Sequence, residues 1–162
     1  MSSNRSLPHV VVLPEDDANS RLANGFHLEM DASQRQMQVL LPVGGWTQVL
    51  ERFKSEHVGR MRRFRNRFMV LLIDFDGDLD RLGYAKDVIP DDLADRVFVL
   101  GALSEPEDLK GDLGHYETIG SAMAKDCREE TDMAWGHELL RHNASELDRL
   151  RVRVRPILFK FI

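Results

Sequence analysis

Short runs of apolar residues alternate along the chain with segments whose apolar residues recur at helical spacing. Four of these runs predict β-strands, at about residues 9–14, 38–43, 68–74 and 96–101. After the first run, apolar side chains recur every four residues from Ala18 to Met30, which predicts a helix over about residues 16–29. Strands that alternate with helices predict βαβ units. The expected fold class is therefore α/β: a Rossmann-like, mainly parallel sheet of about four core strands with flanking helices.

Helix-start signals divide the segments between the later strands. Thr47 is expected to cap a helix that follows the second strand. Ser104 is expected to cap a helix after the fourth strand, because a proline stands in the first turn that would follow. Residues 79–95 are predicted to form a polar connection that ends in a short helix after Pro90.

The last third of the chain is predicted to be mainly helical from Glu117 onward. Residues 151–155 alternate arginine and valine, which predicts a half-exposed strand at an edge or at the end of the sheet. No repeat, low-complexity tract or linker indicates a second domain. We therefore expect one domain over residues 1–162, with a core at about residues 9–102 and a helical C-terminal extension at about residues 103–162.

The composition argues against a disordered protein and against a membrane-spanning one. Hydrophobic residues make up 43% of the chain and charged residues 30%, as in globular rather than disordered proteins. No stretch approaches the length of a membrane span, and the first residues lack the apolar core of a signal peptide. A single cysteine, Cys127, excludes an internal disulfide. These features predict a cytoplasmic protein without a membrane partner.

Three alternating carboxylates end the most apolar run of the chain. Asp74, Asp76 and Asp78 follow residues 69–73 directly, and open α/β sheets bind their ligands at this end of their strands. Like charges that share a small patch repel one another, so a hard divalent cation usually neutralises them. The pattern predicts a site for Mg²⁺ or Mn²⁺. The alternative is an acidic, solvated turn.

A second group of acids ends the first strand. Asp16 and Asp17 suit the first turn of the helix that follows, where the helix dipole favours negative charge. Glu15 precedes them, at the end of the strand itself. If the first and third strands are parallel neighbours, Glu15 lies beside Asp74 and Asp76.

Basic residues cluster apart from these acids, although the net charge is −5. Residues 57–67 contain five arginines and no acid, and residues 149–160 contain five further basic residues. An acidic pocket with basic surface nearby suits a metal site that handles a polyanion. Arg62, Arg63 and Arg65 are the candidate contacts to nucleic-acid phosphates. The alternative is a basic helix face that only solvates itself.

The order and strand context of Glu15, Asp74 and Asp76 resemble a small Toprim domain, related in pattern to the Toprim domains of OLD-type nucleases. In that family one glutamate follows the first strand, and an Asp-x-Asp pair follows a later strand. The resemblance covers about residues 9–102. It implies a Toprim-type sheet in which Asp74 and Asp76 are the main metal ligands, with Asp78 close by. Glu15 would join the metal site and serve as general acid or base. The chain departs from the family where Asp16 stands in place of the usual glycine.

Two other families place acids in a similar way. Asp74-Phe-Asp76-Gly resembles the first motif of haloacid dehalogenase-like phosphatases, but residues 97–102 lack the Ser or Thr which that family places after a later strand. Residues 15–17, Asp74 and Lys160 resemble the acidic pair, phosphoacceptor and lysine of response-regulator receivers, at different spacings.

Together these patterns predict a Mg²⁺- or Mn²⁺-dependent protein that acts on nucleic-acid phosphodiester bonds, in DNA processing or bacterial defence. The alternative is a non-catalytic Toprim-like or receiver-like interaction module. Nucleic acid and a partner subunit are the candidate partners; the chain has no Walker-type loop, so a partner would have to supply any ATPase. Glu105 and Glu107 follow the fourth strand and are open candidates for the site.

Overall fold

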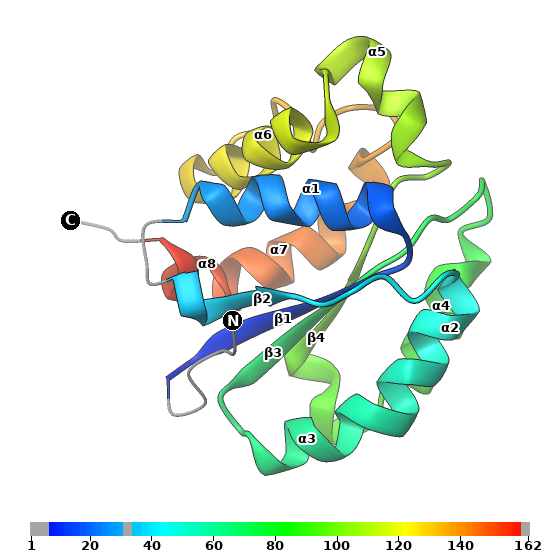
Figure 1. The fold of residues 1–162 in the computed structure, drawn as a ribbon, viewed down its shortest axis with the longest axis vertical. Coiled ribbons are helices and arrows are strands. Elements are labelled where there is room, and N and C mark those ends of the chain that lie inside the picture. Colours follow the sequence, from blue (N-terminus) through cyan, green and yellow to red (C-terminus); the bar gives the residue numbers. More distant parts are fainter. Residues whose placement is uncertain (1–6, 31–33, 160–162) are drawn as a thin grey trace.

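The computed structural model describes residues 7–30 and 34–159, which form an α/β fold around one four-stranded sheet (Figure 1). The strands are β1 (His9–Pro14), β2 (Met37–Val39), β3 (Arg67–Leu72) and β4 (Val97–Leu100). They lie in the order β2-β1-β3-β4, and all three neighbouring pairs are parallel. The predicted α/β class, with a mainly parallel sheet of about four strands and flanking helices, is confirmed.

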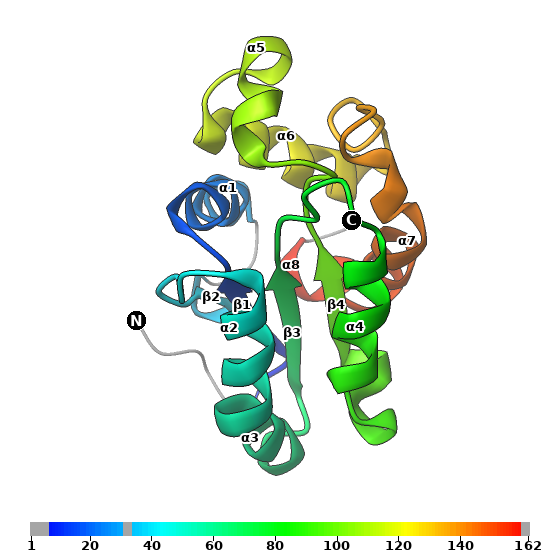
Figure 2. The same cartoon turned by 90° about the vertical axis from the view of Figure 1, so that its right-hand side faces the viewer.

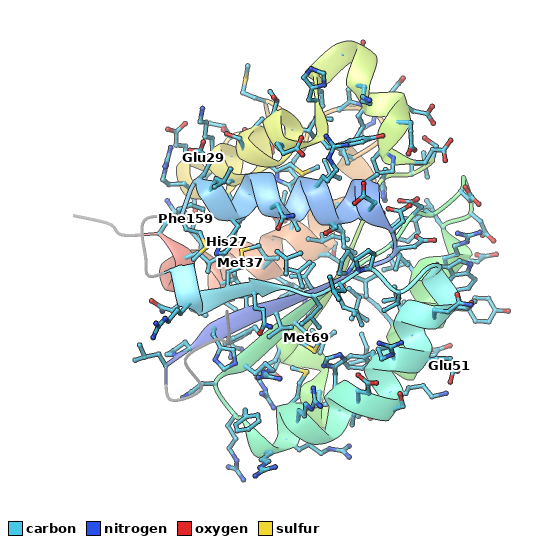
Figure 3. All side chains as sticks on the ribbon, in the orientation of Figure 1. His27, Glu29, Met37, Glu51, Met69 and Phe159 are labelled. Atoms are coloured by element: carbon cyan, nitrogen blue, oxygen red, sulfur yellow. The ribbon has the colours of Figure 1, made fainter. Side chains whose placement is uncertain are left out.

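The register of β1 on β3 explains why these runs become central strands. Six residue pairs join the two strands, from His9 opposite Arg67 to Pro14 opposite Leu72. Successive side chains of a strand point to opposite faces, and both faces of this sheet are covered. Figure 3 shows Met37 and Met69, which belong to the apolar layers on opposite faces of the sheet.

Helices cover the two faces unequally (Figures 1 and 2). One apolar layer joins the sheet to four helices: α1 (Asp17–Leu28), α6 (Tyr116–Glu129), α7 (Ala144–Arg153) and α8 (Arg155–Leu158). The other layer joins it to α2 (Trp46–Arg52), the π-helical turn Phe53–His57, α3 (Val58–Arg63) and α4 (Asp80–Val88). The last third of the chain therefore completes one face of the core.

Short helical segments complete the chain. Single turns of 3₁₀-helix lie at Gln34–Gln36, Pro106–Leu109 and Arg141–Asn143, and a longer one spans Asp91–Arg96. Helix α5 (Lys110–Leu113) links the turn after β4 to α6. Among the described residues, no helix combines the length and apolar character needed to cross a membrane.

Helices α1 and α6 cross at very short range, because a glycine lies at the contact on each. A Cβ atom on Gly120 would lie 1.9 Å from the backbone oxygen of Leu22, and one on Gly25 would lie 2.2 Å from that of Glu117. No side chain fits in either place. This close contact fixes the position of α1 against α6. It thereby also fixes the first turn of α1, which follows the carboxyl end of β1.

The outer edge of β4 is covered by side chains instead of a fifth strand. The Asn143 amide accepts from the Gly101 N–H at 3.1 Å and donates to the Gly101 carbonyl at 2.9 Å. Glu146, which is 2% exposed, accepts from the Val99 N–H at 3.2 Å. These contacts satisfy backbone groups that an unpaired edge strand would leave open.

The strand predicted at residues 151–155 is wrong: α7 continues to Arg153, and α8 begins at Arg155. Leu147, Leu150 and Val154 recur at helical spacing and are buried in the core. Burial of this apolar stripe favours a helix over the strand that the arginine–valine alternation predicted. In the helix, Val152 points away from the core and is 73% exposed.

Four smaller predictions also differ from the structure. The polar connection predicted at residues 79–95 contains helix α4, which buries only Ala85 and therefore has a weak apolar signal. Gly45, not Thr47, is the N-cap of α2, and no side chain caps that helix. Glu105 occupies the cap position predicted for Ser104. The second strand is shorter than predicted and ends at Val39.

Candidate functional site at the carboxyl edge of the sheet

The pairing of β1 with β3 brings Glu15 against the segment that follows β3. The Glu15 N–H donates to the Leu72 carbonyl at 2.9 Å, which continues the ladder beyond the strand. The Glu15 carboxylate accepts from the Asp74 N–H at 2.5 Å. The expected closeness of Glu15 and Asp74 is therefore present, and Glu15 fixes the backbone on which Asp74 stands.

Asp16 and Asn19 link the start of α1 to Asp74. Asp16 is the N-cap of α1, and its Oδ1 atom accepts from the Asn19 N–H at 3.0 Å. The Asn19 side-chain amide donates to Asp16 Oδ1 and to Asp74 Oδ1, both at 2.9 Å. Asn19 is fully buried. Sequence reasoning missed it; the signal was a polar residue on an otherwise apolar helix face.

Asp74 is the buried acid of the site, with 8% of its surface exposed. Burial raises the pKa of Asp74 to about 7, because a charge that leaves water loses its solvation. The hydrogen bond from Asn19 opposes this rise, while the nearby charges of Glu15, Asp16 and Glu107 add to it. Near neutral pH, both the protonated and the ionised form of Asp74 are therefore populated, and pKa values shifted in this way cluster at functional sites.

The remaining two aspartates diverge from Asp74. The backbone turns at Asp76, with φ of 53°, and at Gly77, with φ of 74°. The Asp76 side chain is 66% exposed and pairs with Arg81 at 3.3 Å. Asp78 Oδ1 accepts from the Asp80 N–H at 2.9 Å, at the start of α4. The turn thus separates three acids that an extended backbone would have placed on one face.

Arg81 is a second residue that sequence reasoning missed. Its guanidinium donates to the Asp74 carbonyl at 2.8 Å and pairs with the Asp76 carboxylate. The Cζ atom of the same guanidinium lies 4.7 Å from the centre of the Trp46 ring. Its nearby charge also lowers the pKa of Glu15. Burial is the larger influence on Glu15, so the pKa of that carboxyl is still raised.

Of the two glutamates after β4, Glu107 is electrostatically coupled to Asp74. Its charge is among those that raise the pKa values of Asp74 and Tyr116. Glu105 is exposed, and its own pKa is raised chiefly by the charge of Glu107. The acidic edge is therefore built from three segments: the ends of β1 and β3 and the turn after β4.

The carboxylate oxygens of this acidic edge are the kind of ligand that hard cations such as Mg²⁺ and Mn²⁺ prefer. Across residues 7–30 and 34–159, however, no group of three or more His, Cys, Asp or Glu side chains is arranged to hold a metal ion. The Asn19 amide is hydrogen-bonded to the Asp74 carboxylate, and the Arg81 guanidinium is paired with the Asp76 carboxylate. A cation would have to displace one or both of these contacts.

The predicted phosphate contacts lie at the other end of the sheet. Arg62 and Arg63 end α3, and Arg65 follows in the turn that leads into β3. Asp74 lies seven residues beyond the first residue of β3, about 20 Å along an extended chain. Arg62 pairs with Asp92 through two hydrogen bonds of 3.0 Å. The structure therefore does not bring these arginines to the carboxylates.

No protein-family model, curated protein or solved structure matches this chain. Lys160, the counterpart of the receiver lysine, lies outside the described residues.

Proposed function

We propose that the chain is a divalent-metal-dependent, Toprim-like protein that acts on nucleic-acid phosphodiester bonds at the carboxyl edge of its sheet. One observation carries the proposal: Asp74 is buried among Glu15, Asp16 and Glu107, and its pKa is raised to about 7. A bound Mg²⁺ or Mn²⁺ would relieve this repulsion, as carboxylate sites for hard cations do. The Toprim resemblance of Glu15, Asp74 and Asp76 supports the same chemistry.

Asp74 would be the central metal ligand, and Asp76 would join it after its exposed carboxylate leaves Arg81. Bound metal would stabilise the charge that develops on the phosphate oxygens. Glu15 would hold the Asp74 backbone in place, because its carboxylate already accepts from the Asp74 N–H. Glu15 would also serve as the general acid or base. Asp78 would contribute little, since its carboxylate already accepts from the Asp80 N–H.

Calorimetric titration with Mn²⁺, paired with cleavage assays on supercoiled plasmid and single-stranded DNA, tests the proposal. We expect Asp74→Asn to abolish both metal binding and cleavage. Asp78→Asn is the matched control, because it removes a charge of the same acidic segment and should leave both unchanged. Metal affinity that survives Asp74→Asn would exclude the proposed site. The cytoplasm, where Mg²⁺ meets nucleic acid, is the compartment that we propose.

A non-catalytic interaction module is the second candidate, and the hydrogen bonding of the site favours it. Within the described part of the chain, Glu15, Asp16, Asp74 and Asp76 each accept from a donor of the protein itself. Such an edge is stable without a substrate. In this case a partner subunit, as in a defence system, would supply catalysis. Metal binding without cleavage, together with a stable partner on purification, would favour the module.

A further inference from the structure

A pair of aromatic rings lies near the carboxylates, and one of the two, Trp46, shares the Arg81 guanidinium with them. Trp46 is the first residue of α2, and Tyr84 lies on α4. Their ring centres are 6.2 Å apart, with an edge-to-face angle of 63°. The guanidinium that lies over Trp46 belongs to Arg81, which also donates to the Asp74 carbonyl. A short chain of contacts thus joins the aromatic pair to Asp74.

The packing of the core does not account for the exposure of Tyr84. Tyr84 is 65% exposed, whereas its neighbour Ala85 is fully buried against the sheet. Arg81 and Tyr84 are one helical turn apart, so both lie on the side of α4 that faces Trp46. Trp46 is half-buried and fixes the position of the pair. Much of the Tyr84 ring is therefore open to a ligand, held at a set distance from the acidic edge.

We propose that Trp46 and Tyr84 form a stacking surface for an unpaired nucleobase, and that the substrate is therefore single-stranded nucleic acid. This inference rests on the proposed function, because it places the backbone phosphate of the same strand at the carboxylates. Exposed aromatic rings bind single strands by stacking on bases. Bases inside a duplex are already stacked, so a duplex does not present the face that Tyr84 requires.

The charge of the edge sets the conditions for binding. Glu15, Asp16, Asp74 and Glu107 repel a phosphate backbone, and Arg81 is a cation that contacts Asp74 and Asp76. Binding therefore requires a divalent cation as well as a base. An abasic strand keeps the phosphates but cannot stack, so its affinity separates the contribution of phosphate binding from that of base stacking.

Fluorescence anisotropy of a labelled oligothymidylate measures this binding, with Ca²⁺ as a hard cation in place of Mg²⁺ to limit cleavage. We expect Tyr84→Ala to weaken binding about 10-fold or more, and Tyr84→Phe, which keeps the ring, to bind within about 2-fold of wild type. An abasic strand of equal length and a thymidine–adenine duplex should bind as weakly as Tyr84→Ala binds oligothymidylate. Met133→Ala is the control, because that side chain is 83% exposed and lies after α6, away from this pair.

Trp46 supplies a second signal. Base stacking beside it should quench its fluorescence, and Trp46→Phe should remove that change while Trp135, which is buried in the core, keeps its emission. Equal affinities of wild type and Tyr84→Ala, equal affinities for abasic and intact strands, or no binding by wild type would each overturn the inference. Mn²⁺ titration of Asp74→Asn tests the proposed function separately, since it uses no nucleic acid.

Discussion

The side-chain amide of Asn19 donates to Asp74 Oδ1 at 2.9 Å, between residues 55 positions apart in the chain. The same amide holds the cap of α1 through Asp16. One buried polar side chain therefore joins the first helix to the most acidic segment of the protein. Any change in the charge of Asp74 acts on this contact.

Asp74→Asn should change how stability depends on pH. Because the pKa of Asp74 is raised to about 7 in the folded protein, the folded state holds a proton between about pH 4 and 7 that the unfolded state has lost. The stabilising contribution of protonated Asp74 is therefore complete below about pH 4, falls as pH rises from 4 to 7, and is lost above 7. We expect Asp74→Asn to be more stable than wild type at about pH 8, by on the order of 2 kcal/mol, and similar at lower pH.

Urea unfolding of both proteins across this range measures the effect. The comparison at each pH removes the contributions of other groups, including His57, whose pKa is lowered to about 4 by burial. A constant difference between the two proteins across the range would show that Asp74 does not titrate near neutral pH.

Metal binding should release a proton from Asp74. A cation binds the ionised carboxylate, and below about pH 7 that carboxyl is largely protonated. We expect Mn²⁺ affinity to rise between about pH 6 and 8 and up to about one proton to be released at the lower pH. Calorimetry in two buffers with different ionisation enthalpies counts the protons. Affinity that does not change with pH would exclude Asp74 as a ligand.

Asn143→Ala should destabilise the protein because it removes the cover from the β4 edge. Both backbone groups of Gly101 would lose their partner in a buried setting. We expect a loss of about 2–4 kcal/mol in the free energy of unfolding. The exposed Ser145 lies two residues away, and Ser145→Ala should change it by less than about 0.5 kcal/mol. Similar values for the two variants would mean that the edge is satisfied in another way.

Gly120→Ala should be destabilising although alanine is the better helix former. The new Cβ would overlap the Leu22 carbonyl, so α1 and α6 would have to separate, at a cost of about 1–3 kcal/mol. Gly83→Ala is the matched control: it lies within α4, with nothing within 4 Å of the added atom, and should gain about 0.5–1 kcal/mol. Thermal melting compares the two. Stabilisation of both would contradict the close crossing.

Replacing Arg62, Arg63 and Arg65 together with alanine should leave Mn²⁺ affinity unchanged, because these residues lie at the other end of the sheet from Asp74. If they contact nucleic acid, the salt dependence of binding should become shallower while the rate at saturation stays the same. Binding measured at several salt concentrations tests this. A loss of metal affinity would mean that the two ends are coupled.

Apolar runs and helical spacing predicted the four strands, the first helix and a mainly parallel sheet. Strands of a parallel sheet are covered on both faces, so their sequences are continuously apolar and can be recognised. The same patterns placed Glu15 and Asp74 at strand ends, and their closeness followed once β1 and β3 were neighbours. These features depend on local pattern and on the connection rules of βαβ units. The sequence by itself therefore determined the α/β class and which acids end the strands.

Tertiary structure alone decided which polar groups meet and which diverge. Asn19 and Arg81 reach Asp74 from separate helices, while the turn at Asp76 sends its carboxylate outward and α3 places the arginines at the opposite edge. Likewise, the side chains that cover β4 took the place of a fifth strand. Hydrogen-bond partners and buried charges depend on distances across the fold, which spacing along one chain does not encode.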